Sequence, residues 1–226
     1  MYLEIDNYQP AYRSVGGYLQ PGVLPATLMR LRIGGPFNIV KGALHTGSLE
    51  HVEFTKYFTQ QLQPGMLPHG LKVLLFEEYD WPIEYDMLPA TLEALIFRYT
   101  LKVPLRPHVL PHGLQTLIIG DKFNFPLECG VFPSTLKQLR IGNAFNQPLQ
   151  PEVLPSGLES LKLGKHYHQP IDFSKEAKVI PYGLHRFRMG KSTPRHRLDH
   201  GNAVRQYSVD MRRFRPEIAH NLAAAP

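Results

Sequence analysis

Hydrophobic positions recur along most of the chain in one pattern: a Leu-Pro pair, two further residues, a leucine, and a short run in which apolar and polar side chains alternate. The last four intervals between the prolines of this phrase are 21, 22, 22 and 22 residues. The prolines are Pro25, Pro68, Pro89, Pro111, Pro133 and Pro155. The first interval is 43 residues and contains a divergent unit, LHTGSL, with His45 in place of proline. A regular period of this length predicts a solenoid.

The unit VLPHGLQTLIIGDKFNFP, which starts at Val109, shows how one coil is expected to be built. Leu117 and Ile119 are two residues apart, which predicts a strand with alternate side chains pointing inward. A glycine follows this strand in five units, where the chain needs a positive φ or a close backbone approach. These glycines are Gly34, Gly120, Gly142, Gly164 and Gly190. The proline-rich remainder cannot be helical, so it is expected to return the chain in an extended conformation.

An aromatic residue and a short polar residue come after the glycine position in most units. The aromatic residues are expected to fill the interior of each coil, and they are Phe37, Phe58, Phe123, Phe145 and Tyr167. The polar residues are Asn38, Thr59, Asn124, Asn146 and His168. Stacked at one position, their side chains can bond the backbone of the adjacent coil. The strands of about eight such coils would form one parallel sheet, so the fold is expected to be mainly β.

The consensus LPxxLxxLxIGxxFNxP resembles the FNIP repeat, a leucine-rich-repeat variant abundant in social amoebae and in giant DNA viruses of amoebae. Phe37-Asn38-Ile39 and Phe145-Asn146-Gln147-Pro148 carry the likeness, which extends over residues 24–190. The resemblance implies a right-handed, leucine-rich-repeat-like solenoid with a role in protein interaction. Members of the family often carry an F-box. The residues before the first complete unit resemble half a repeat, so a complete F-box is not expected there.

The chain divides into a repeat solenoid over residues 1–190 and a basic tail over residues 191–226. Within the solenoid, residues 1–23 are interpreted as a partial N-terminal repeat or cap, and residues 24–190 as the repeats. In the tail, apolar residues at helical spacing predict a helix over residues 203–214. They are Val204, Tyr207, Met211 and Phe214. This helix is expected to cap the open end of the solenoid; the alternative is a basic arm for an anionic surface or a second subunit.

The side chains that alternate with the inward leucines should lie on the outer face of the sheet. In the middle coils we expect this face to expose an apolar strip, which we predict to be a protein contact. The apolar strip consists of Val73, Leu75, Ala94, Ile96, Thr116 and Ile118. Two alternatives stay open: the chain itself could cover these residues, or the strand alternation could slip by one and reverse the faces.

Basic side chains lie at both ends of the same face. The chain carries a net charge of +6, and its tail is strongly basic, a distribution that suits nucleic acid or another polyanion. The candidate polyanion-binding residues are Arg30, Arg32, Arg140, Lys162, Arg186, Arg188, Arg212 and Arg213. Polyanion binding is therefore the alternative function, and a structural place in a larger assembly such as a virion is a third.

Catalytic chemistry is not indicated. The 11 histidines have no accompanying cysteine or acidic cluster at metal-ligand spacing, and the single cysteine, Cys129, has no identifiable base. We expect no enzyme activity, no metal and no cofactor. No apolar run approaches the roughly 18 residues of a membrane span, and no signal peptide is recognisable. An intracellular setting is expected, either cytoplasmic or in a virion.

Overall fold

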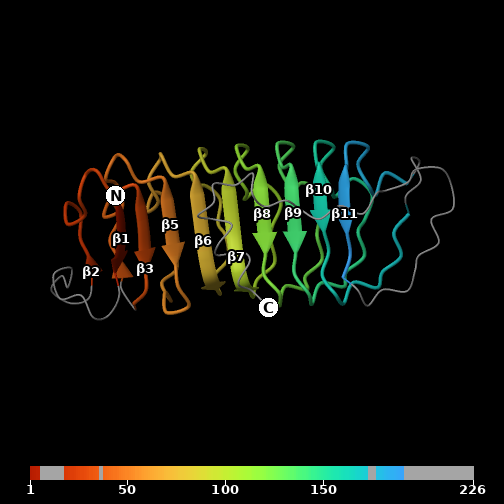
Figure 1. The fold of residues 1–226 in the computed structure, drawn as a ribbon, viewed down its shortest axis with the longest axis horizontal. Coiled ribbons are helices and arrows are strands. Elements are labelled where there is room, and N and C mark those ends of the chain that lie inside the picture. Colours follow the sequence, from red (N-terminus) through yellow and green to blue (C-terminus); the bar gives the residue numbers. More distant parts are fainter. Residues whose placement is uncertain (6–17, 36–37, 173–176, 191–226) are drawn as a thin grey trace.

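A computed structural model describes residues 1–5, 18–35, 38–172 and 177–190. In these ranges the regular structure is entirely β, and nine strands form one sheet whose members lie side by side along the long axis of the molecule (Figure 1). The strands are β1 (Tyr2–Ile5), β3 (Arg30–Ile33), β5 (His51–Phe54), β6 (Val73–Tyr79), β7 (Ala94–Leu101), β8 (Thr116–Ile119), β9 (Gln138–Ile141), β10 (Ser160–Lys162) and β11 (Arg186–Arg188). Two short strands, β2 (Tyr18–Leu19) and β4 (Asn38–Ile39), pair in a second parallel sheet.

Each strand of the main sheet pairs in parallel with the strand one coil further along the chain. The register places equivalent repeat positions side by side: Leu74 pairs with Leu95, and Leu95 pairs with Leu117. This is the geometry expected of stacked coils, so the predicted parallel solenoid of about eight coils is confirmed. The additional strand, β1, pairs in register with β3 and lies where the half repeat at the N-terminus was expected.

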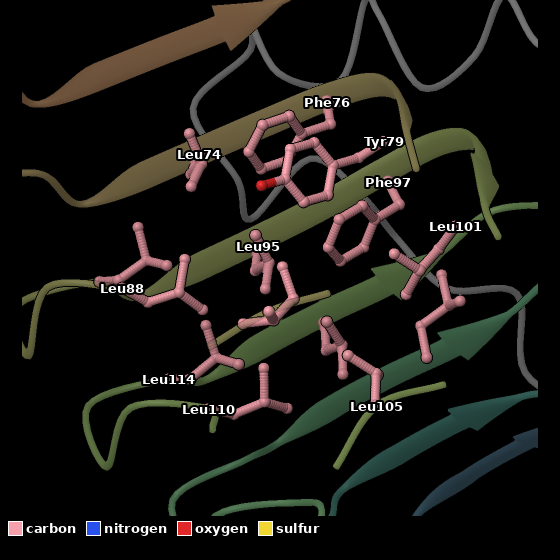
Figure 2. Packing of buried hydrophobic residues seen from close by; sticks show 14 of the residues in the cluster. Leu74, Phe76, Tyr79, Leu88, Leu95, Phe97, Leu101, Leu105, Leu110 and Leu114 are labelled. Carbon is pink, nitrogen blue, oxygen red and sulfur yellow. The ribbon is translucent and has the colours of Figure 1, made fainter. Parts of the chain in front are cut away.

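The interior of the solenoid is a continuous column of apolar side chains, part of which Figure 2 shows. Phe54, Phe76 and Phe97 stack along its axis with ring centroids 5.2 and 5.6 Å apart. A second stack runs from Phe123 through Phe145 to Tyr167, at 6.2 and 5.8 Å. Offset aromatic stacking adds to the stabilisation from burial. The predicted inward orientation of the coil aromatics is confirmed for Phe58, Phe123, Phe145 and Tyr167, all of them buried.

The predicted ladder of polar residues is present in the C-terminal coils. The backbone N–H of Asn146 donates to Oδ1 of Asn124, and the backbone N–H of His168 donates to Oδ1 of Asn146, both at 2.8 Å. A second ladder, which the sequence did not predict, runs from Asp121 through Asn143 to Lys165 with bonds of 3.2 Å. These side chains satisfy backbone donors that lie beyond the ends of the strands.

Glycine is required after the strand because adjacent coils approach closely there. A Cβ on Gly142 would collide with the backbone of Gly120 and Asp121, and a Cβ on Gly164 would collide with Gly142 and Asn143. None of these three glycines has a positive φ, so close approach explains them. In the coils of β6 and β7, Glu77 and Arg98 replace the glycine, and these strands continue to 7 and 8 residues.

A left-handed residue recurs in the return segment of successive coils, a feature that the sequence pattern did not predict. It is Asp86 in one coil, His108 in the next, Gly130 in the third and Glu152 in the fourth, with φ between 57° and 84°. Only glycine adopts this conformation without a steric cost. The variable return position is thus conformationally fixed although its residue type varies.

Several predictions fall on residues outside the described ranges. They are the helix over residues 203–214, the rest of the tail with Arg212 and Arg213, the aromatic Phe37, and residues 6–17 of the partial N-terminal repeat. The division between the solenoid and the tail at residue 190 therefore stays a prediction.

Candidate interaction face

The outward side chains of the main sheet form two straight rows, because every strand pairs in register with the next. The first row is Arg30, His51, Val73, Ala94, Thr116, Gln138, Ser160 and Arg186. The second row is Arg32, Glu53, Leu75, Ile96, Ile118, Arg140, Lys162 and Arg188. The alternation therefore has the predicted sense, and the slip by one residue does not occur. All six residues of the apolar strip lie together at the middle of this face.

The exposure of the apolar strip differs from the prediction. Leu75, Ile96 and Ile118 form a hydrophobic cluster of their own, separate from the interior, and are only 3%, 1% and 8% exposed. Ala94 and Thr116 are buried as well, which leaves Val73 as the one half-buried member of the strip. The strip is on the predicted face, but it is not open to solvent as expected. Lateral contact between the three aliphatic side chains accounts for part of this burial.

An ion-pair cluster borders the apolar strip on the N-terminal side. Arg32 contacts Glu4 at 2.7 Å, Glu53 at 3.2 Å and Glu77 at 3.3 Å. Burial acts to lower the pKa of Arg32, but the three carboxylates outweigh it, so its pKa is raised. Because Arg32 is surrounded by carboxylates, it is a poor anion site, although the sequence placed it among the candidate polyanion-binding residues.

Arg98 belongs to the same cluster but is incompletely paired. Its Nη1 contacts Glu77 at 3.4 Å, and its Nη2 is 3.7 Å from Glu53. Both Nε and Nη2 are buried without a hydrogen-bond partner. Buried guanidinium donors are normally satisfied, so these two N–H groups mark a place where an acceptor is missing.

A basic row borders the apolar strip on the C-terminal side. Arg140, Lys162 and Arg188 are in register on adjacent strands, and such strands are about 4.8 Å apart. Burial lowers the pKa of Lys162, and the charges of Arg140 and Arg188 lower it further. Among the described residues, none of the three cations has a carboxylate at ion-pair distance. Of the predicted polyanion residues, these three are brought together by the fold, and Arg186 lies beside them in the first row.

Exposed aromatic side chains also lie near the carboxyl ends of the central strands, a feature that the sequence reading largely missed: Tyr57 and Trp81 follow β5 and β6, and Tyr99 lies within β7. Tyr57, Trp81 and Tyr99 are 55%, 42% and 43% exposed. The indole of Trp81 is held in place by a hydrogen bond. Its Nε1 donates to the carbonyl of Thr59 at 2.9 Å, so the ring is anchored and exposed at once. The signal in the sequence is that these aromatics occupy divergent units.

Other candidate chemistry has no assembled site in the described part of the chain. Cys129 is exposed, and its thiol donates to the carbonyl of Pro151 at 3.6 Å. No group of three metal-ligating side chains occurs among the described residues. The described ranges also contain no helix with the length and apolarity that a membrane crossing requires.

Comparison with known proteins relates this architecture to a repeat family and to a solved structure. The model of the FNIP Repeat matches four segments, residues 46–79, 58–100, 103–144 and 145–191. The solved structure is that of CroV588, described as a novel circular LRR protein, with 30% sequence identity and a TM-score of 0.72. The match covers 78% of this chain and 26% of that one, so this chain corresponds to about a quarter of CroV588. No curated protein matches the chain significantly.

The family matches agree with the fold in detail. They extend across most of the solenoid, and they include strands β5 to β11, Gly120, Gly142 and Gly164, and the Asn ladder. The chain therefore belongs to the FNIP repeat family and folds as a leucine-rich-repeat-like solenoid.

Proposed function

We propose that the protein is a non-enzymatic interaction module that binds a protein partner through the outward face of its main sheet. The observation that carries this proposal is the apolar strip, an in-register aliphatic cluster on the outer side of a sheet whose inner side already forms the core. Solenoids use extended faces of this kind for binding. Apolar centres with charged borders are typical of protein interfaces.

The borders of the apolar strip indicate the chemistry of the partner. Nine strands at a spacing of about 4.8 Å give a face about 40 Å long, which can accommodate a helix or an extended segment. The centre favours aliphatic or aromatic side chains. Nε and Nη2 of Arg98 lack a hydrogen-bond acceptor, and the row of Arg140, Lys162 and Arg188 favours acidic groups. We therefore expect a partner segment that combines an apolar centre with carboxylates toward the β9–β11 side.

Affinity capture from the cell of origin tests this function. The full chain is compared with the double variant Leu75→Lys/Ile96→Lys and with Glu128→Lys, which adds positive charge at an exposed return segment. We expect Glu128→Lys to retain the partner and the double variant to lose it while keeping the circular dichroism of the native fold. Val73→Lys, at the half-buried end of the apolar strip, serves as a milder variant if the double variant unfolds. Partner capture that both Val73→Lys and the double variant leave unchanged would overturn the proposal.

Polyanion binding is a second candidate, which the unpaired basic row supports. Burial lowers the pKa of Lys162 and the charges of Arg140 and Arg188 lower it further; an anion lying across Arg140 and Arg188 would relieve that repulsion. Heparin or a single-stranded oligonucleotide is the suitable probe. Polyanion binding should weaken steeply with salt and should fall in Arg140→Gln/Arg188→Gln. Capture through the apolar strip should change little over the same salt range.

A further inference from the structure

We propose that residues 203–214 of this chain form an amphipathic helix that docks on the apolar strip and occupies it when no partner is bound. The docking itself concerns this chain alone. Its consequence, that a partner must displace the helix, rests on the function proposed above. Three features of the chain support this docking: the burial of the apolar strip, the unpaired Nε and Nη2 of Arg98, and the length and pattern of the tail.

Neighbours within the sheet do not explain how deeply the apolar strip is buried. Val73 and Gln138 lie in the same row as Ala94 and Thr116 and have strands on both sides, yet they are half-buried. Outward side chains on a single sheet layer keep one side open unless another layer covers them. Ile96 is only 1% exposed. A covering layer above Ile96 is therefore required.

The described residues show no second apolar layer above this cluster. The aliphatic cluster consists of Leu75, Ile96 and Ile118, and no other described apolar side chain belongs to it. Nε and Nη2 of Arg98 are also shielded from solvent without a hydrogen-bond partner, so the covered area extends beyond Ile96 along β7. The covering segment should combine apolar side chains with at least one acceptor.

Of the undescribed segments, only the tail, residues 191–226, is long enough and free enough at one end to cover the apolar strip. Residues 6–17 also contain apolar residues at helical spacing, Tyr8, Ala11, Tyr12 and Val15, but they are tethered at both ends, to β1 and β2. β1 is four strands from β7, about 19 Å away at the usual spacing, and a segment of this length that must reach out and return extends only about 20 Å, which leaves no length for a helix. The other two undescribed segments have two and four residues. The tail follows β11, four strands from β7, a separation of about 19 Å at the usual strand spacing. Residues 191–202 reach up to about 40 Å when extended. A helix over 203–214 is about 18 Å long, enough to cross β6, β7 and β8.

The side chains of the tail fit the apolar strip. Val204, Tyr207, Met211 and Phe214 share one side of a helix, and this side matches an aliphatic surface in character. Asp210 flanks that side and offers the acceptor that Arg98 lacks. Arg205, Arg212 and Arg213 fall on the opposite side, where they would remain in solvent. The cap over the end of the solenoid, expected from the sequence, is the competing position for the same helix.

Thiol labelling of the full chain tests the docking without any partner. In a Cys129→Ser background, Thr116→Cys places a small reporter in the apolar strip, and Gln138→Cys reports on a half-buried position in the same row. We expect Thr116→Cys to react with a maleimide about tenfold more slowly than Gln138→Cys, because labelling requires the helix to open. Tyr207→Asp/Phe214→Asp should remove this protection while the circular dichroism and melting temperature of the solenoid persist. Equal labelling rates, or protection that the tail substitutions leave intact, would overturn the proposal.

Disulfide trapping gives a second test that does not depend on disrupting the tail. Thr116→Cys paired with Met211→Cys should oxidise to an intramolecular crosslink, whereas Thr116→Cys with Val209→Cys, on the opposite side of the helix, should not. Crosslinking that is equal for the two pairs would contradict the docked orientation. Protection or crosslinking that increases with protein concentration would instead identify a second copy as the occupant. A chain that passes both tests but captures no partner would refute the proposed function and leave the docking intact.

Discussion

Asn124 accepts on its side-chain oxygen the backbone N–H of Asn146, one coil further along the chain, at 2.8 Å. Asn146 does the same for His168, so a polar side chain connects each coil to the next at the point where the sheet no longer supplies backbone partners. We expect Asn146→Ala to leave the N–H of His168 unpaired and to lower the free energy of unfolding by about 1 kcal/mol. Asn146→Asp keeps the acceptor oxygen and is the matched control. Equal urea midpoints for wild type and Asn146→Ala would show that the ladder contributes nothing.

The close approach of the coils at the post-strand glycines predicts that a substitution there lowers stability more than the loss of a ladder bond does. Gly142→Ala places a Cβ against the backbone of Gly120 and Asp121, so it should destabilise the fold by about 2 kcal/mol or more. Gly70→Ala is the control, since a Cβ there meets no atom within 4 Å. Chemical denaturation of the two variants checks the difference. Similar stabilities would mean that the coils are not in contact at this position.

The recurring left-handed position predicts a stabilising substitution. His108 has a φ of 64°, and glycine would remove its steric cost of about 1–2 kcal/mol. The greater freedom of glycine in the unfolded chain offsets about half of this, so His108→Gly should raise stability by about 0.5–1 kcal/mol. Gly130→Ala, at a φ of 84°, should lower the stability of the fold. A fall in melting temperature for His108→Gly would contradict this explanation.

The basic row predicts a dependence on pH. Because the pKa of Lys162 is lowered in the folded state, its charged form costs stability at every pH below the folded pKa, and the cost disappears as pH rises to the unfolded pKa. Lys162→Met should therefore stabilise the protein at neutral pH and low salt, by about a few tenths of a kcal/mol because the side chain is partly exposed and its charge is screened by solvent. The gain should shrink above about pH 10. Lys137→Met, at an exposed site, is the control, and a gain from Lys162→Met that is independent of pH and salt would exclude repulsion as its cause.

The sequence predicted those features of the fold that follow from the repeat. Equivalent residues such as Leu95 and Leu117 must occupy equivalent places when coils stack, so the strands, their inward and outward faces, the coil aromatics and the Asn ladder could all be read from the period. Features that depend on the neighbouring coil could not. The Asp121–Asn143 ladder and the left-handed His108 have no constant residue type across the units, so no pattern marks them.

The sequence predicted where the candidate site lies, but not whether its side chains are exposed to solvent. The alternation of Leu74 and Leu75 determines which face each side chain occupies. Whether Leu75 and Ile96 are open or covered depends on chain that lies far away in sequence, and a periodic pattern contains no information about it. For a similar reason, only some of the predicted polyanion-binding residues suit an anion. Arg32 has three glutamates around it, whereas Arg140 and Lys162 lie beside other cations.

The central claim, that the outward face binds a protein through the apolar strip, is tested most directly by the dissociation constant of the captured partner. Wild type, Leu75→Lys/Ile96→Lys and Glu128→Lys are compared in titrations of the purified partner, with folding verified for each by circular dichroism. Loss of two central contacts at about 1.4 kcal/mol or more each predicts binding at least about 100-fold weaker for the double variant, with Glu128→Lys unchanged. A folded double variant that binds the partner as tightly as wild type would contradict the claim.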